Sequence, residues 1–122
     1  MLFFMKNLLI IILFALPLTI TAQTKNAVLA ELKRQGVPHA GIVLAQARLE
    51  TGNFKSALCR KHHNLFGIKR GRSYARYATW QQSVADYKKR ISSRYKGGDY
   101  YAFLQRIGYA EDGKYISKLK SF

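Results

Sequence analysis

Apolar residues recur at intervals of three and four along most of the chain, and this spacing predicts amphipathic helices. The first helix is expected at residues 27–35, with Asn26 as its N-cap. A second is expected at residues 38–50, with Pro38 in its first turn and Gly52 as its C-cap. The remaining helices are expected at residues 55–60, 80–95, 100–107 and 113–122.

The pattern changes between residues 65 and 77, where apolar and polar positions are too closely mixed for a helix face. This segment predicts a short two-stranded β element that turns at residues 70–72 around Gly71. With 122 residues, the chain is long enough for one domain only. The predicted fold class is therefore mostly α (α+β), with a small β-hairpin lobe.

The N-terminal segment reads as a targeting signal rather than as part of the domain. Residues 8–20 are almost entirely apolar, Lys6 precedes them, and a small residue, Ala22, offers a cleavage point. The sequence thus predicts a signal peptide at residues 1–22 and a domain at residues 23–122. The apolar run is short for a membrane span, although the alternative that the leader is kept as a membrane anchor remains open. We expect an exported protein of the periplasm, or of the extracellular space and cell wall.

The net charge of the chain indicates which kinds of partner the protein binds. The formal net charge is +15, and removal of the leader takes away only Lys6, which leaves +14. Such a charge favours anionic partners, such as wall polymers, lipid head groups or peptide carboxylates, while the leader argues against nucleic acid. We expect a monomer that does not stay on the membrane after cleavage. Cys59 is the only cysteine, so an intrachain disulfide is excluded.

Glu50 is the first candidate for chemistry. Val43, Ala47 and Glu50 are spaced i, i+4 and i+7, so the carboxylate completes an apolar stripe at the C-terminal end of its helix. Desolvation and the negative end of the helix dipole both disfavour the charged carboxylate. A carboxyl group that stays protonated is suited to act as a general acid. The alternative is a surface residue in the last helical turn.

Three segments then follow one another at residues 45–52 (AQARLETG), 63–69 (HNLFGIK) and 108–115 (GYAEDGKY). They resemble the motifs A-Q-x-x-x-E-[ST]-G, N-N-L-F-G-[IM]-K and G-Y-A-T-D-P-x-Y of the glucosaminidase family of peptidoglycan hydrolases, glycoside hydrolase family 73. The chain departs from these motifs at His63, Glu111 and Gly113. The resemblance covers roughly residues 25–122, and three ordered motifs are more specific than one.

The resemblance implies a lysozyme-like fold and an endo-β-N-acetylglucosaminidase that cleaves the glycan strands of peptidoglycan. It implies catalytic roles for Glu50 and Tyr109. Residues expected to bind substrate are Gln46, Asn64, Phe66 and Asp86. Structural alternatives remain for these residues: core packing for Tyr109, a tight turn for Asn64 and Phe66, and core hydrogen bonding for Asp86.

No metal or cofactor is expected. Cys59, His62 and His63 offer three crowded ligands with no partner cluster, which is too few for a zinc site. We expect a buried thiol and a basic surface loop there instead.

Two other functions stay open. A lytic transglycosylase on the same fold also needs one glutamate, and a cationic protein that binds cell wall or membrane would need no chemistry at all. The second catalytic group is a further question, because residues 51–85 contain no Asp or Glu. Asp86 and Glu111 are the candidates from the protein, and the 2-acetamido group of the substrate is the alternative, which we favour.

Overall fold

The computed structural model describes residues 22–109 and 113–122, and it is mostly helical with one small sheet, as predicted. Except for Ala22, the predicted signal peptide lies outside the described residues, as does Glu111, a candidate for the second catalytic group. In the part of the chain that is described, no helix has the length and apolar character to cross a membrane. The helices are α2 (Lys25–Arg34), α3 (Ala40–Thr51), α4 (Ala57–His62), α5 (Trp80–Arg90), α6 (Tyr100–Arg106) and α7 (Gly113–Lys120), with a 3-10 turn, η2 (Ser92–Arg94).

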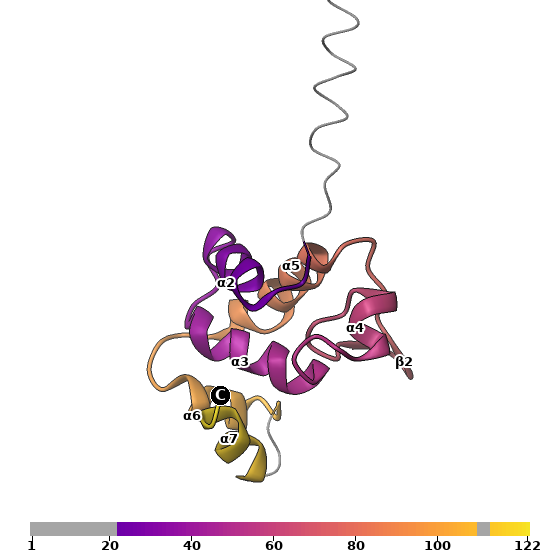
Figure 1. The fold of residues 1–122 in the computed structure, drawn as a ribbon. Helices are drawn as coiled ribbons and strands as arrows, with labels where there is room; N and C mark the ends of the chain where they lie inside the picture. The colour runs from indigo at the N-terminus through magenta and orange to yellow at the C-terminus, as the bar shows by residue number, and fades with distance from the viewer. Residues whose placement is uncertain (1–21, 110–112) are drawn as a thin grey trace, which may run out of the picture.

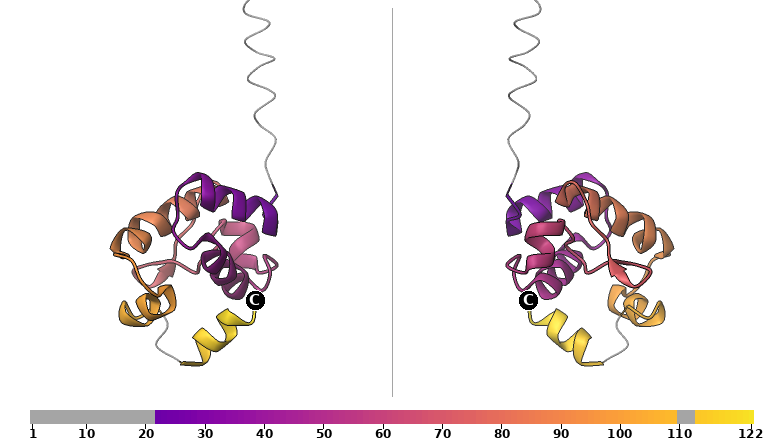
Figure 2. Two further views of the ribbon diagram at one scale, coloured as in Figure 1. Left: turned by 90° about the vertical axis from the view of Figure 1, so that its left-hand side faces the viewer. Right: turned by 90° about the vertical axis from the view of Figure 1, so that its right-hand side faces the viewer.

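Helix α3 lies in the middle of the fold, with α2 and α5 on one side and α6 and α7 on the other (Figure 1). The side views in Figure 2 show the same arrangement. Both α2 and α7 pack directly against α3. The inner stripe of α3, which includes Val43 and Ala47, is completely buried. The helix that carries Glu50 is thus held on opposite sides by segments from early and late in the sequence.

Two predicted helix starts are wrong. Helix α3 begins at Ala40, so Pro38 lies before its first turn, and His39 is its N-cap in a left-handed conformation without a side-chain cap. Helix α2 begins two residues earlier than predicted, because Thr24 rather than Asn26 is its N-cap. The Thr24 hydroxyl accepts the N–H of Ala27 at 3.1 Å. At the end of α3 the prediction is confirmed: Gly52 adopts a left-handed conformation with φ 56°, and its N–H bonds to the carbonyl of Arg48.

The helix predicted at residues 80–95 is wrong in length, because α5 ends at Arg90. Ile91 leaves helical geometry with φ −111°, and η2 follows. Ser93 then donates its hydroxyl to the carbonyl of Lys89 at 2.6 Å, so a side chain takes up one of the terminal carbonyls. Tyr95 still packs on Phe103, with ring centroids 5.3 Å apart, which explains why the apolar spacing continues past the end of the helix.

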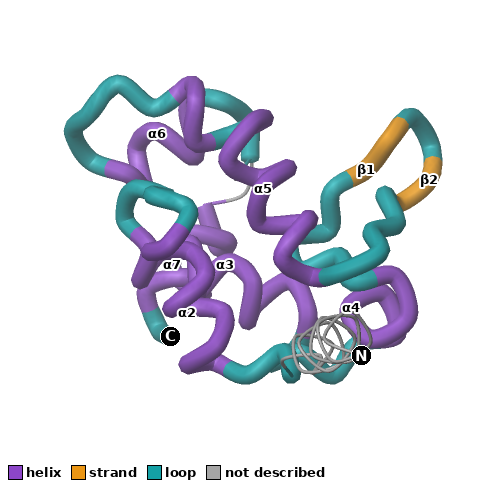
Figure 3. Tube along the Cα trace, turned by 90° about the horizontal axis from the view of Figure 1, so that it is seen from above, coloured by secondary structure: helices purple, strands orange, loops and turns teal. Residues whose placement is uncertain are grey.

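The β element is shorter than predicted. Strand β1 (Lys69–Arg70) pairs antiparallel with β2 (Ser73–Tyr74), in a register that places Lys69 opposite Tyr74. Gly71 turns between them with φ 64°. Leu65 precedes the strands and packs in the core instead. Figure 3 shows the hairpin projecting from one side of the helical body.

Cys59 is buried, as predicted, and it fastens the start of the described chain to α4. Its thiol donates to the side-chain oxygen of Gln23 at 2.6 Å, and Gln23 in turn donates to the Cys59 carbonyl at 3.2 Å. Burial raises the pKa of the thiol to about 11, so it is neither a nucleophile nor a ready metal ligand at neutral pH. Among residues 22–109 and 113–122, no cluster of His, Cys, Asp and Glu could hold a metal ion.

Candidate functional site

An open cavity of about 830 Å³ lies against the C-terminal end of α3. Four segments that are far apart in the sequence form its wall: the end of α3, the loop before β1, the end of α5 with η2, and the segment after α6. The lining residues are Glu50, Phe66–Lys69, Arg90, Ile91, Arg94, Gly108 and Tyr109. The first and third sequence motifs therefore meet the second motif at this cavity.

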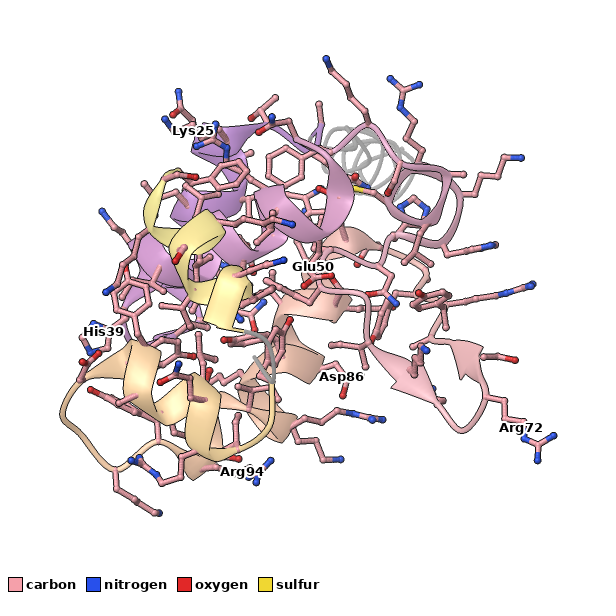
Figure 4. The ribbon with its side chains drawn as sticks, turned by 90° about the horizontal axis from the view of Figure 1, so that it is seen from below. Lys25, His39, Glu50, Arg72, Asp86 and Arg94 are labelled. Carbon is pink, nitrogen blue, oxygen red and sulfur yellow. The ribbon has the colours of Figure 1, made fainter. Side chains whose placement is uncertain are left out.

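Glu50 is the one carboxylate that lines the cavity among the described residues. Val43 and Ala47, which form the apolar stripe of the same helix, are fully buried, whereas Glu50 is exposed to solvent. Figure 4 shows Glu50 near the middle of this face, between α7 and the loop that leads to the hairpin. The surrounding protein raises the pKa of Glu50 by desolvation, while a hydrogen bond from Tyr115 acts in the opposite direction.

Gly67 brings the loop backbone close to Glu50. It has φ 65°, and a Cβ atom at this position would lie 3.4 Å from Oε2 of Glu50. This left-handed conformation favours glycine, and a Cβ atom here would be in contact with the Glu50 carboxyl. Gly67 was not singled out from the sequence, although its place within the second motif was a usable signal.

Tyr109 lines the same cavity. Its hydroxyl donates to the carbonyl of Phe66 at 3.2 Å, and its N–H bonds to the carbonyl of Leu104 at 3.0 Å. Its ring lies 5.9 Å from the ring of Tyr115. Burial is the main reason that the pKa of Tyr109 is well above its ordinary value, with the charge of Glu50 contributing, so Tyr109 stays a neutral hydrogen-bond donor.

Phe66 lines the cavity but is nearly buried, and its ring packs at 4.5 Å on the ring of Tyr87. Asn64 is fully buried. Its amide nitrogen donates to the carbonyls of Ile68 and Ala75 at 2.9 and 3.0 Å, and its oxygen accepts the N–H of Ile68 at 3.1 Å and that of Phe66 at 3.3 Å. Asn64 therefore supports the turn before β1, which is the structural alternative considered for it.

Gln46 is also fully buried, one helical turn before Glu50. Its side-chain oxygen accepts the hydroxyl of Tyr87 at 2.5 Å, and its nitrogen donates to the hydroxyl of Tyr115 at 3.5 Å. Both amides are fully buried and hydrogen-bonded inside the protein, so the positions of Gln46 and Asn64 give no support to the predicted contact with substrate, which stays a prediction.

Asp86 does not line the cavity. Its carboxylate accepts the hydroxyl of Tyr77 at 2.6 Å and Nε of Arg90 at 2.8 Å, and it lies 3.7 Å from Arg70. Burial alone would raise the pKa of Asp86, but these donors and cations outweigh it and lower the pKa. Asp86 therefore ties the hairpin to α5 as a charged group, and substrate binding by Asp86 has no support from its position.

Positive charge surrounds Glu50. Lys69, Arg90 and Arg94 all line the cavity, and the Arg90 charge is shared with Asp86. Figure 4 shows Arg72 at the far tip of the hairpin and Arg94 on the opposite side of Glu50. A polymer that carries carboxylates would meet cations on both sides of the acid.

Comparison with known families agrees with this arrangement. Residues 25–122 match the family model Glucosaminidase, described as mannosyl-glycoprotein endo-β-N-acetylglucosaminidase. No match was found among curated proteins or among solved structures. Because the family model spans well over half of the chain, including Glu50 and the whole cavity, the chain belongs to the glucosaminidase family, glycoside hydrolase family 73, and is a glycoside hydrolase of the endo-β-N-acetylglucosaminidase type.

Proposed function

We propose that the protein is an exported endo-β-N-acetylglucosaminidase that cleaves the glycan strands of peptidoglycan, with Glu50 as its general acid. The observation that carries this proposal is the position of Glu50, whose carboxyl faces an open cavity while its pKa is raised by desolvation. A general acid has to be both reachable and protonated. The family supplies the substrate class, because its members act on peptidoglycan.

In the proposed reaction, the Glu50 carboxyl gives its proton to the glycosidic oxygen as the bond to the anomeric carbon breaks. The other cavity-lining residues bind and orient the strand. Tyr109, which is neutral and lines the cavity, is proposed to orient the reacting sugar, and Phe66 forms part of the floor.

Mass spectrometry of digested sacculi tests the cleavage itself. Hydrolysis by a glucosaminidase leaves a reducing N-acetylglucosamine end, whereas a lytic transglycosylase leaves an anhydro-muramyl end. Anhydro products would replace the proposal with the second function. Absence of any product from a folded enzyme would favour a cationic protein that only binds the wall.

The second catalytic group is proposed to come from the substrate. Enzymes with two catalytic carboxylates hold them roughly 5–10 Å apart, but Glu50 is the only carboxylate that lines the cavity within residues 22–109 and 113–122. The 2-acetamido oxygen of N-acetylglucosamine would attack its own anomeric carbon as the leaving group departs. Water would then open this ring, giving its proton to the Glu50 carboxylate, with net retention of configuration.

Early NMR spectra of the reaction decide this point, since the first product should carry the β anomer. The variant Asp86→Asn should keep its turnover, even though the substitution removes the charged contact between Asp86 and the hairpin. An α anomer in the first minutes would contradict substrate assistance. An Asp86→Asn or Glu111→Gln enzyme that is as inactive as Glu50→Gln yet equally stable would contradict it too.

Export is the remaining part of the proposal, and its support is the apolar segment at residues 8–20 behind Lys6. Expression of the full chain in a bacterium, followed by intact-mass analysis of the exported protein, tests it. Cleavage after Ala22 gives a chain that starts at Gln23. A full-length chain recovered from the membrane fraction would indicate that the leader is kept as an anchor.

A further inference from the structure

Cationic side chains line the cavity beside Glu50, and they differ in whether a carboxylate already neutralises them. Among the described residues these cations are Lys69, Arg90 and Arg94. Arg90 is committed, because its Nε lies 2.8 Å from the Asp86 carboxylate. Lys69 and Arg94 are exposed, and no ion pair joins either of them to a carboxylate within the part of the chain that is described. The charges of Lys69 and Arg94 are therefore available to a ligand.

The two available cations come from different walls of the cavity. Lys69 is the first residue of strand β1, and its Nζ lies 5.3 Å from the ring centroid of Tyr74 on the paired strand, so a cation–π contact helps to hold it in place. Arg94 is the last residue of η2, which follows α5. Figure 4 shows Arg94 to the left of Glu50 and the hairpin to its right. A chain of sugars that passes Glu50 would thus meet a cation from either wall.

Neither cation is explained by the acid or by the fold. A cation close to Glu50 would lower the pKa of its carboxyl group. Desolvation raises this pKa, and the causes of the shift include neither Lys69 nor Arg94. Exposed charges also contribute little to the stability of a folded protein. The position of the two cations therefore indicates a ligand that carries negative charge.

The proposed substrate carries anions beside the sugar that is cut. Peptidoglycan strands alternate N-acetylglucosamine with N-acetylmuramic acid, so the N-acetylglucosamine beside Glu50 has a muramic acid on each side. Each muramic acid bears a lactyl side arm, which ends in a carboxylate where it is bare. Where the arm is substituted, the attached stem peptide has carboxylates of its own. Because the sugar rings are uncharged, this side arm is the part of the strand that a cation recognises.

We propose that Lys69 and Arg94 are specificity-determining residues that bind carboxylates of the muramic acid side arms on the two sides of the reacting N-acetylglucosamine. This inference rests on the proposed function, because it places an N-acetylglucosamine beside Glu50. Arg94 can bind a carboxylate through two parallel N–H bonds, whereas Lys69 acts as a compact charge. The protein therefore selects strands that carry carboxylates over neutral polymers of N-acetylglucosamine.

Calorimetric binding to soluble glycan fragments tests the assignment, with Glu50→Gln as the parent protein so that turnover does not interfere. Three fragments of equal sugar number are compared: a bare strand, the same strand with its carboxylates converted to amides, and a strand that keeps its stem peptides. Arg94→Gln and Lys69→Gln should each weaken binding of a charged fragment by about two- to fivefold. Binding of the amidated fragment should not change, because the partner charge is already absent.

The fragments also separate the two sources of carboxylate. A loss of affinity confined to the bare strand assigns the contact to the lactyl carboxylate. A loss confined to the peptide-bearing strand assigns it to the stem peptide, and a loss with both strands means that either source is accepted. All three results support the proposal, because each depends on a carboxylate of the side arm.

Matched controls lie outside the cavity and remove the same charge. Lys120 corresponds to Lys69, because its Nζ lies 4.9 Å from the ring centroid of Tyr101. Arg106, exposed at the end of α6, corresponds to Arg94. Lys120→Gln and Arg106→Gln should bind every fragment as the parent does. Equal losses in the control and cavity variants would overturn the proposal, since only net charge would then matter.

The proposal is also overturned if Arg94→Gln and Lys69→Gln bind the charged fragments like the parent, or lose as much affinity for the amidated fragment. Melting curves identify unfolded variants, and Arg94→Met or Lys69→Met then takes the place of the glutamine variant. Failure of the proposed function gives a different result. If Glu50→Gln still cleaves glycan while binding depends on Lys69 and Arg94, the proposed acid fails and the recognition of carboxylates stands.

Discussion

At the scale of single residues, the carboxyl group of Glu50 meets two opposing requirements. It is accessible from an open cavity, yet the protein around it raises its pKa. Replacement by Gln keeps the size and removes the proton. We expect Glu50→Gln to lose on the order of 10²–10⁴ in rate or more, measured as dye release from labelled sacculi. Its circular dichroism spectrum should match the wild type, and substantial turnover by a folded variant would remove Glu50 from the mechanism.

The raised pKa of Glu50 also links activity and stability to pH. Activity that needs the protonated carboxyl is lost as pH rises through the pKa of the folded enzyme. The folded state holds this proton more tightly than the unfolded chain, so Glu50 costs stability as pH rises above the unfolded value of about 4.3. We therefore expect the difference in Tm between Glu50→Gln and the wild type to change in favour of the variant as pH rises from mildly acidic to neutral. A Tm difference independent of pH would contradict this.

The substitution Gly67→Ala tests whether activity depends on the space between the loop backbone and the Glu50 carboxyl. In Gly67→Ala, strain of about 1–2 kcal/mol arises from the left-handed conformation, and the new Cβ lies 3.4 Å from the Glu50 oxygen. We expect lower stability and lower kcat. Gly71→Ala is the control, because Gly71 has φ 64° and no atom within 4 Å of a new Cβ. Equal loss of activity in both variants would mean that backbone strain alone matters.

At the scale of elements, the sequence predicts those features, such as helix positions and caps, that depend on residues close together in the chain. Helical spacing located every described helix approximately, and the C-cap at Gly52 was predicted from one residue. The end of α5 was missed because Tyr95 packs on Phe103 after the helix has ended, so the apolar spacing continues past Arg90. Gln46 lies three residues after Val43 on the inner stripe of α3, so its burial was a usable signal that was missed. Its partner Tyr115 could not be predicted, since it is 69 residues away and only the folded chain brings the two together. The position of Glu50 in the last turn of its helix was predicted because its motif and its helix are both local, and its catalytic role stays a prediction.

Asn64 is the clearest example of an element held by one side chain. Its amide satisfies four backbone groups in the segment that leads into and out of the hairpin. Asn64→Ala would leave buried groups unpaired, at a cost of about 2–3 kcal/mol in unfolding free energy. Urea denaturation measures this. Asn26→Ala, at an exposed position of α2, should change stability by less than about 0.5 kcal/mol, and equal effects would contradict the role of Asn64.

At the scale of the whole molecule, the excess of positive charge is expected to speed the approach to an anionic polymer. Salt screens charges over about 10 Å at 0.1 M, so activity on sacculi should fall as salt rises. The proposed contact surface is the basic hairpin, made up of Lys69, Arg70, Arg72 and Arg76. Neutralising these four residues should weaken binding to sacculi and flatten its salt dependence. Neutralising four exposed lysines outside the hairpin, Lys25, Lys33, Lys88 and Lys89, is the control, and equal effects would mean that only net charge matters.

The packing of α7 on α3 also has a consequence for the order in which the enzyme becomes active during its synthesis. Glu50 is made early, with its helix, but α7, which packs on that helix, lies near the C-terminal end of the chain. The contact between Gln46 and Tyr115 spans 69 residues and forms only after α7 has been made and has docked. A chain that ends before α7 therefore carries Glu50 on a helix that lacks one of its packing partners, and we expect this helix to be fully packed only in the complete fold.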